Sequence, residues 1–169
     1  MEEVMKKYLL IMAMFGVMFA GCAKKQMVKP QPIVPVTPVA SENKEEPSIR
    51  YDDWTEATGV SIVYFDYDSS NLSDSGRSVL KTNAEFLKSN AGMVALVEGH
   101  CDERGTVEYN LALGQRRAAV VREYYITLGV PADSVGTISY GKEKPAVPGN
   151  SEEAWAKNRR AVTKVRNKK

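Results

Sequence analysis

Two close pairs of acidic side chains each follow a segment typical of a β-strand. Asp66 and Asp68 follow the run VSIVY, and Asp102 and Glu103 follow the run MVALVEG. Paired carboxylates can hydrolyse glycosidic bonds when one of them is kept protonated by burial. Both acidic pairs lie at the ends of predicted loops. A Ser-His-Asp triad would have to use His100, because the chain has one histidine. We therefore expect a binding protein and not an enzyme, with glycoside hydrolysis as the alternative.

A second arrangement pairs Asp102 with Arg117. Asn110, Leu113 and Arg117 are three, four and seven residues apart, and this spacing places them on one face of a helix. That face would point toward the loop of Asp102 and Thr106, where the helix N-terminus offers free amides to a carboxylate. On spacing alone, Asp102 and Arg117 are equally well explained as a structural ion pair or as the two poles of a ligand site.

The first residues are typical of a lipoprotein signal peptide, which we assign to 1–21. Lys6 and Lys7 precede an uncharged run over 8–20, about 13 residues long, whereas a membrane-spanning helix needs roughly 20. The sequence FAGC that ends at Cys22 resembles a lipobox, with Phe19 where Leu is usual. An ordinary cysteine near a cleavage site elsewhere is the alternative, but no Ala-x-Ala site ends the run. We expect Cys22 to be acylated (palmitate) and, with Ala23 after it, to anchor the chain in the outer membrane.

The remaining thiol is Cys101, so a lipidated Cys22 leaves no partner for an intrachain disulfide. His100 and Cys101 together are too few ligands for a structural zinc site. We expect neither a metal nor a cofactor.

Composition divides the rest of the chain into a tether and one domain. Residues 22–50 hold five of the eight prolines and little apolar surface, which predicts a disordered linker. Its 28 residues after Cys22 span roughly 30 Å as a flexible coil and up to about 85 Å if polyproline-like. Residues 51–169 suffice for a single domain with its own core. The net charge of +2 predicts no nucleic-acid partner, and the basic stretch from 158 onward is interpreted as a solvated strand and tail.

Helices and strands alternate within this domain. Strands are predicted over residues 60–66, 93–98, 135–140 and 160–166, and helices over 73–89, 107–128 and 151–158. Ser73 is a suitable N-cap, and Gly129 with Pro131 beyond it ends the long helix. The order βαβαβαβ predicts an α/β (α+β) sandwich, with helices packed on one small sheet.

Several stretches of this domain resemble the OmpA-like peptidoglycan-binding domain family. They are Phe65-Asp66-Tyr67-Asp68-Ser69 with Leu72, Gly99 to Thr106, Glu108-Tyr109-Asn110, Leu113 to Ala118, Ser139 to Glu143 with Pro145, and Asn158 to Val162. The resemblance covers residues 60–165 and implies a four-stranded mixed sheet. Together with the lipobox and the tether, it is greatest to the lipid-anchored members of the family.

The resemblance also implies a ligand and partners. The ligand is the diaminopimelate of the peptidoglycan stem peptide, with Asp102 on its ammonium and Arg117 on its carboxylate. Asp68, Thr106, Asn110 and Leu113 complete the implied site. The partners are peptidoglycan and the Tol envelope proteins, with the periplasmic TolB competing for the domain, in a role in cell division. A wall anchor without Tol partners is the alternative.

Other residues in the matching stretches are expected to have structural roles. Arg104, Arg116 and Glu103 are interpreted as solvated or scaffold-pairing residues, and His100 as a packed or hydrogen-bonded residue at the strand end. Cys101 departs from the family, which usually has Thr there. Because a thiol is a poorer hydrogen-bond donor than a hydroxyl, its support for Asp102 is expected to be weaker.

Replacing Cys22 should separate the two ends of the protein. We expect Cys22→Ser to abolish labelling by an alkynyl fatty acid and to release the protein from membranes, because the acyl chains supply the anchor. Binding of the purified variant to peptidoglycan should be unchanged. Retention of the variant in the membrane fraction would contradict the assignment of Cys22.

Overall fold

The computed structural model describes residues 53–168. The predicted signal peptide (1–21) and the whole of the predicted tether (22–50), with its expected acylation site Cys22, lie outside the described residues. The elements are β1 (Val63–Tyr64), α2 (Asp74–Ser89), β2 (Met93–His100), α3 (Val107–Thr127), a 3₁₀ turn (Ala132–Ser134), β3 (Val135–Gly141), α4 (Glu152–Asn158) and β4 (Arg160–Asn167). Within this part of the chain, no helix is long and apolar enough to cross a membrane.

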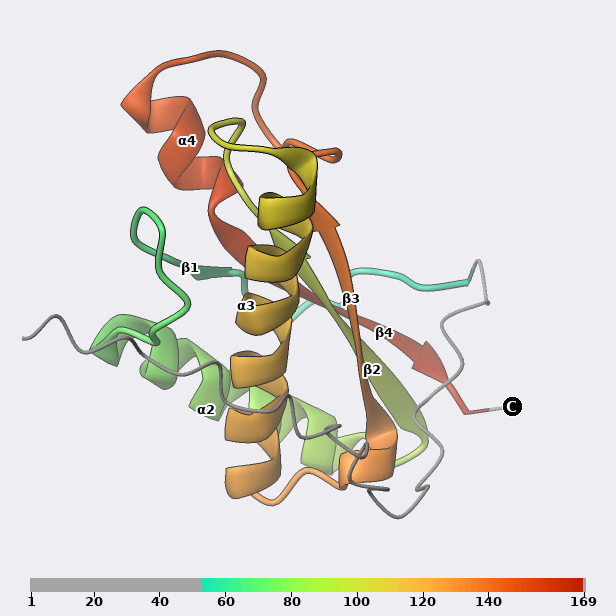
Figure 1. Ribbon diagram of the computed structural model, residues 1–169. Coiled ribbons are helices and arrows are strands. Elements are labelled where there is room, and N and C mark those ends of the chain that lie inside the picture. The colour runs from blue at the N-terminus through green and yellow to red at the C-terminus, as the bar shows by residue number, and fades with distance from the viewer. Residues whose placement is uncertain (1–52, 169) are drawn as a thin grey trace, which may run out of the picture. The chain divides into compact units, whose positions relative to one another are not determined.

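The strands form one mixed sheet in the order β1-β4-β2-β3 (Figure 1). β2 runs parallel to β3, while β4 lies between β1 and β2 and is antiparallel to both. The predicted βαβαβαβ order and the four-stranded mixed sheet are therefore confirmed.

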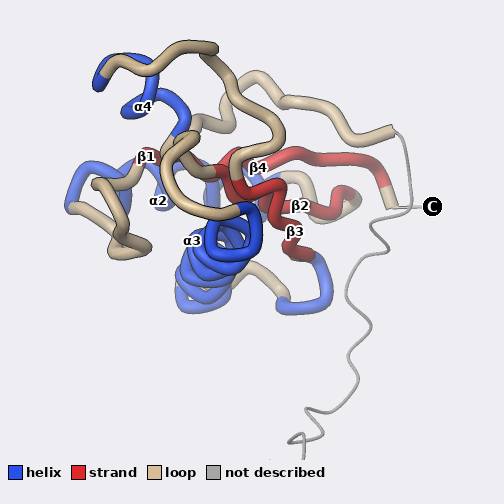
Figure 2. The backbone as a smooth tube through the Cα atoms, turned by 45° about the horizontal axis from the view of Figure 1, so that its top comes forward, coloured by secondary structure: helices blue, strands red, loops and turns tan. Residues whose placement is uncertain are grey.

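The main core lies between one face of the sheet and two helices. Figure 2 shows α3 almost end-on, with α2 and α3 on the same side of the strands. α2 contributes Leu80, Ala84 and Leu87, and α3 contributes Ala118, Val121 and Tyr125, all buried against the sheet. The sheet contributes Ala95, Val97, Val135, Ala161 and Val165. Alternate residues of each strand face this layer, as the two-residue period of a strand requires.

The three helices start within one residue of the predicted positions, and Ser73 is the N-cap that was predicted. The side chains of Ser73, Thr106 and Ser151 each accept a backbone N–H of the first turn, as Ser and Thr do at N-cap positions. The 3₁₀ turn before β3 was not predicted.

The first strand is much shorter than predicted. Residues 60–66 were expected to form it, but only Val63 and Tyr64 pair with β4. The backbone of Ser61 is instead bonded at both its N–H and its C=O to the side-chain amide of Asn83 on α2, at 2.8 Å each. Ser61 therefore has no ladder groups left for a neighbouring strand.

Two glycines bring α3 unusually close to β2. A Cβ added to Gly99 would overlap the carbonyl oxygen of Gly114, and a Cβ on Gly114 would lie 2.9 Å from the carbonyl oxygen of Gly99. Because main-chain atoms of β2 contact main-chain atoms of α3 here, neither element can relieve a clash by moving a flexible side chain. The contact sets the depth of α3 one turn before Arg117.

The variant Gly99→Ala should therefore lose roughly 3 kcal/mol or more of unfolding free energy, since overpacking against backbone costs at the top of the usual range. Urea denaturation followed by circular dichroism would measure the loss. Gly92→Ala is the matched control, because a Cβ there has open space around it. Equal stability of the two variants would show that α3 can shift without cost.

Candidate functional site

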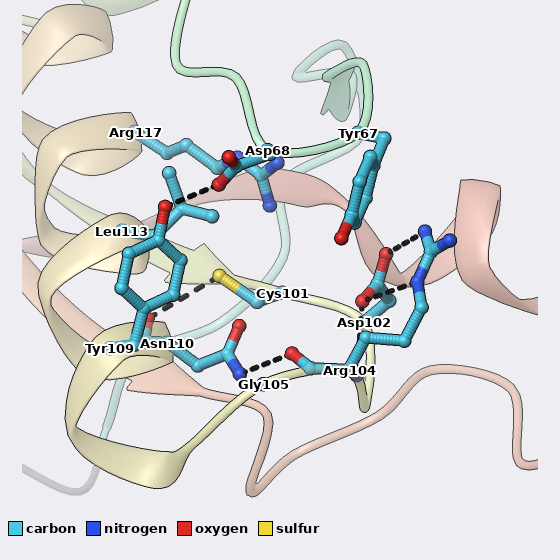
Figure 3. Close-up of a pocket in the computed structure, with 10 residues that line it drawn as sticks. All are labelled: Tyr67, Asp68, Cys101, Asp102, Arg104, Gly105, Tyr109, Asn110, Leu113 and Arg117. Carbon is cyan, nitrogen blue, oxygen red and sulfur yellow. Dashed lines mark hydrogen bonds and ion pairs between the residues drawn. The ribbon is translucent and has the colours of Figure 1, made fainter.

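A pocket lies at the end of the domain where the β1–α2 and β2–α3 loops meet the first turns of α3 (Figure 3). Its cavity has a volume of about 230 Å³. The lining residues are Tyr67, Asp68, Cys101, Asp102, Arg104, Gly105, Tyr109, Asn110, Leu113 and Arg117.

Five of the six residues predicted to bind a ligand line this pocket: Asp68, Asp102, Asn110, Leu113 and Arg117. Thr106 is not among the lining residues. Its hydroxyl accepts the N–H of Tyr109 at 3.2 Å and its carbonyl accepts the Asn110 amide at 2.9 Å, so that it caps α3 and holds the loop.

Arg117 is a buried cation that is bonded to neutral groups. Its guanidinium donates to the main-chain carbonyls of Ser69 at 2.8 Å, His100 at 2.8 Å and Asp66 at 3.0 Å. Its side chain is fully buried, and desolvation lowers its pKa from the ordinary 12.5. None of the ion pairs between described residues includes it. Three of its five N–H groups are used, which leaves two donors beside the cavity.

Asp102 is a buried anion that already has two cationic partners. Arg104 donates to it from its main-chain N at 3.1 Å, its Nε at 3.2 Å and its Nη2 at 2.6 Å. Arg159 lies on the other side, with Nη1 3.5 Å from Oδ2. Burial alone would raise the pKa of Asp102, but the hydrogen bonds from Arg104 outweigh it and hold the pKa below the usual 3.8. The simple Asp102–Arg117 ion pair considered from the spacing is not formed.

Asp68 supplies a second, more exposed carboxylate. The Tyr109 hydroxyl donates to its Oδ1 across the cavity from α3 (Figure 3), and this bond raises the pKa of Tyr109. Asp68 has a φ of 51°, in the left-handed region that residues other than Gly, Asn and Asp rarely occupy. This turn brings its side chain to the cavity.

The other lining residues are either apolar or hydrogen-bonded to neighbouring residues of the pocket wall. The Asn110 side-chain amide donates to the carbonyl of Arg104 at 2.7 Å, which closes the loop around Gly105. Gly105 has a φ of 88°, a backbone conformation that glycine adopts without strain and that lets the loop turn sharply there. The Cys101 thiol donates to the carbonyl of Asn110 at 3.3 Å and not to Asp102, and burial raises its pKa. Leu113 contributes an apolar side chain.

Sequence reasoning missed three lining residues. Tyr67 and Tyr109 were quoted only as parts of motifs, although Tyr109 lies four residues before Leu113 and eight before Arg117 on the same helical face. Arg104 was interpreted as a solvated or scaffold-pairing residue. It does pair with Asp102, but it also lines the pocket.

Two neighbouring residues match their expected structural roles. His100 is buried and packs against Tyr140, with ring centroids 5.6 Å apart, and desolvation lowers its pKa. Glu103 accepts the indole N–H of Trp155 at 3.2 Å, as a scaffold residue would.

The model of the OmpA family matches residues 64–159, which include every residue that lines the pocket. The chain belongs to the OmpA family. The resemblance inferred from the motifs is thereby confirmed.

Relatives in the OmpA family include two proteins named peptidoglycan-associated lipoprotein. That of Pasteurella multocida is 51% identical over 100 residues, covering 59% of this chain and 67% of the relative. That of Haemophilus influenzae is 50% identical, covering 59% and 65%. The matches thus span about two thirds of the relatives' own lengths.

Two solved structures agree with the fold of this chain. The peptidoglycan-associated lipoprotein of Burkholderia pseudomallei has a TM-score of 0.60 at 46% identity, covering 62% of this chain and 89% of that one. The C-terminal domain of Helicobacter pylori MotB has a TM-score of 0.61 at 21% identity, with 65% and 87% coverage, and shows the fold alone.

The pocket is therefore suited to noncovalent binding. Its lining includes the carboxylates of Asp68 and Asp102 and the buried guanidinium of Arg117 (Figure 3). A glycosidase acid needs a raised pKa, whereas that of Asp102 is lowered. The reported relatives are named as lipoproteins and not as enzymes.

The lowered pKa of Asp102 predicts how its contribution to stability depends on pH. Its carboxylate stabilises the fold above the unfolded value near 3.8, and this contribution is lost as the pH falls through the lower folded value. We expect Asp102→Asn to unfold more easily than wild type at pH 7 and the difference to narrow below about pH 4. Chemical denaturation across this range measures it, with the exposed Asp74→Asn as control. A difference that stays constant into acid would contradict the charged role of Asp102.

Proposed function

We propose that the domain binds peptidoglycan by holding the zwitterionic end of diaminopimelate in this pocket. The observation that carries the proposal is Arg117, a fully buried guanidinium with two free donors and no carboxylate partner among the described residues. Burying a charge without a counter-ion is costly, and an anionic ligand would supply the counter-ion. Arginine is suited to a carboxylate because its planar fork can bind both oxygens.

The opposite charge is supplied by Asp102 and Asp68. An ammonium group is a point charge with several donors, and it can bind carboxylates that still accept hydrogen bonds. Asp68 has one described partner, Tyr109, while Asp102 is held by Arg104 and Arg159. We assign the ammonium to Asp102, with Asp68 beside it, and the carboxylate to Arg117. Asn110 and Leu113 line the space between, and Thr106 supports the loop.

The wider role combines this site with the predicted anchor. Lipid on Cys22 and a tether over residues 22–50 would join the outer membrane to the cell wall, with the domain in the periplasm. The names of the relatives support a lipoprotein that associates with peptidoglycan. Partnership with TolB and the other proteins of the Tol-Pal system, in envelope integrity and cell division, belongs to the same proposal. It rests on the resemblance.

Co-sedimentation of the purified domain with peptidoglycan tests the proposal, with free diaminopimelate and cadaverine as competitors. Cadaverine is the matched control because it has the same two amines on a five-carbon chain but carries no carboxylate for Arg117. We expect diaminopimelate to displace the domain and cadaverine to leave it bound. Asp102→Asn should weaken binding by roughly 1.5 to 3 kcal/mol, the usual worth of a charged hydrogen bond.

Arg117 needs a gentler substitution than alanine, because its removal leaves three main-chain carbonyls without a donor. Arg117→Lys keeps the charge but removes the fork, and should lower affinity at constant charge. Asp74→Asn, exposed on α2, serves as control for both variants. Full binding by Asp102→Asn and Arg117→Lys, or release of sugars or peptides from the peptidoglycan, would overturn the proposal.

A further inference from the structure

A stack of three side chains lies beside the pocket and joins three separate segments of the chain. The guanidinium carbon of Arg104 lies 3.9 Å from the centre of the Tyr67 ring and 3.9 Å from the centre of the Trp155 ring. Tyr67 belongs to the β1–α2 loop, Arg104 to the β2–α3 loop and Trp155 to α4. Tyr67 and Arg104 line the pocket, whereas Trp155 does not.

The stack fixes the side chain that orients Asp102. A cation between two aromatic rings is attracted to both, by roughly 0.5 to 2 kcal/mol each. The same Arg104 guanidinium donates to Asp102 through Nε at 3.2 Å and Nη2 at 2.6 Å. The position of the Asp102 carboxylate therefore depends on the stack.

α4 is held to the same loop at two further points. The Trp155 indole donates to Glu103 at 3.2 Å. Arg159, which follows α4, lies 3.5 Å from Asp102 and donates to Glu152 at 2.7 Å. Together, α4 and the residue that follows it contact three consecutive residues of the loop: Asp102, Glu103 and Arg104.

We propose that Trp155 is a positioning residue for the pocket: by stacking on Arg104, it holds the Asp102 carboxylate where the cationic end of the ligand binds. The inference rests on the proposed zwitterion site. The opposite arrangement would have Arg104 compete with the ligand for Asp102, so that a looser Arg104 would bind ligand more tightly. The sign of the effect therefore separates positioning from competition.

The test compares Trp155→Ala, Trp155→Phe and Trp54→Ala with wild type. Trp54 is the matched control, because its ring also lies near an arginine, 5.0 Å from the guanidinium carbon of Arg166, and it is absent from the pocket lining. Two quantities are measured: the affinity for free diaminopimelate by calorimetry, and the pKa of Asp102 by carboxyl carbon NMR. The pKa measurement needs no ligand. The charged groups that face Asp102 are Arg104 from its own loop, Arg159 after α4 and Arg117 from α3.

We expect Trp155→Ala to weaken diaminopimelate binding roughly three- to tenfold, the equivalent of one partly exposed cation–π contact. The pKa of Asp102 should rise toward 3.8, because Arg104 no longer stays beside it. Trp155→Phe should restore both quantities and Trp54→Ala should change neither.

Tighter binding by Trp155→Ala, or an unchanged pKa of Asp102, would overturn the positioning role. Weaker binding with an unchanged pKa would mark a general loosening of the fold and would overturn it too. If wild type fails to bind diaminopimelate while the pKa still rises in Trp155→Ala, the ligand assignment falls and the hold of Trp155 on Asp102 stands.

Discussion

The burial of the Arg117 guanidinium constrains the whole end of the domain that carries the pocket. Its three hydrogen bonds reach the carbonyls of Asp66 and Ser69 in one loop and of His100 at the end of β2. Without Arg117, each of these carbonyls would lack a hydrogen-bond donor, which costs about 1 to 3 kcal/mol of unfolding free energy for a buried group. The same side chain thus ties the β1–α2 loop to the sheet and lines the cavity. In the proposed function, Arg117 both supports the fold and binds the ligand.

The two acidic residues divide these tasks differently. Asp102 is buried between Arg104 and Arg159, and its charge joins the β2–α3 loop to α4. Asp68 is exposed, strained at a φ of 51° and bonded to Tyr109 alone among the described groups. Strained backbone positions of this kind collect at binding sites, where the surrounding structure holds them in place. The pocket therefore combines one rigid carboxylate with one that is readily available.

Much of the fold followed from local signals in the sequence. The caps at Ser73, Thr106 and Ser151 and the stop at Gly129 are chemical features of single residues, and the helix bounds fall within one or two positions of them. The length of β1 could not be predicted, because the Asn83 side chain that binds Ser61 lies on another element. The helical spacing of Asn110, Leu113 and Arg117 was enough to place them on one side of the pocket. The Tyr67–Arg104–Trp155 stack joins residues far apart in the chain, and no spacing rule connects them.

The position of β4 in the sheet has a consequence for the order of assembly. β4 is the last of the described strands, yet it lies between β1 and β2 and supplies the pairing edge to both. A chain that emerges from its N-terminal end can form α2, α3 and the parallel β2–β3 pair, but β1 has nothing to pair with until β4 arrives. Pairings between distant segments form slowly, because closing the long intervening loop costs conformational entropy before the strand pairing contributes any stability. The domain should thus stay partly open until β4 has been synthesised, and the β1–α2 loop that Arg117 binds should be among the last parts to become ordered.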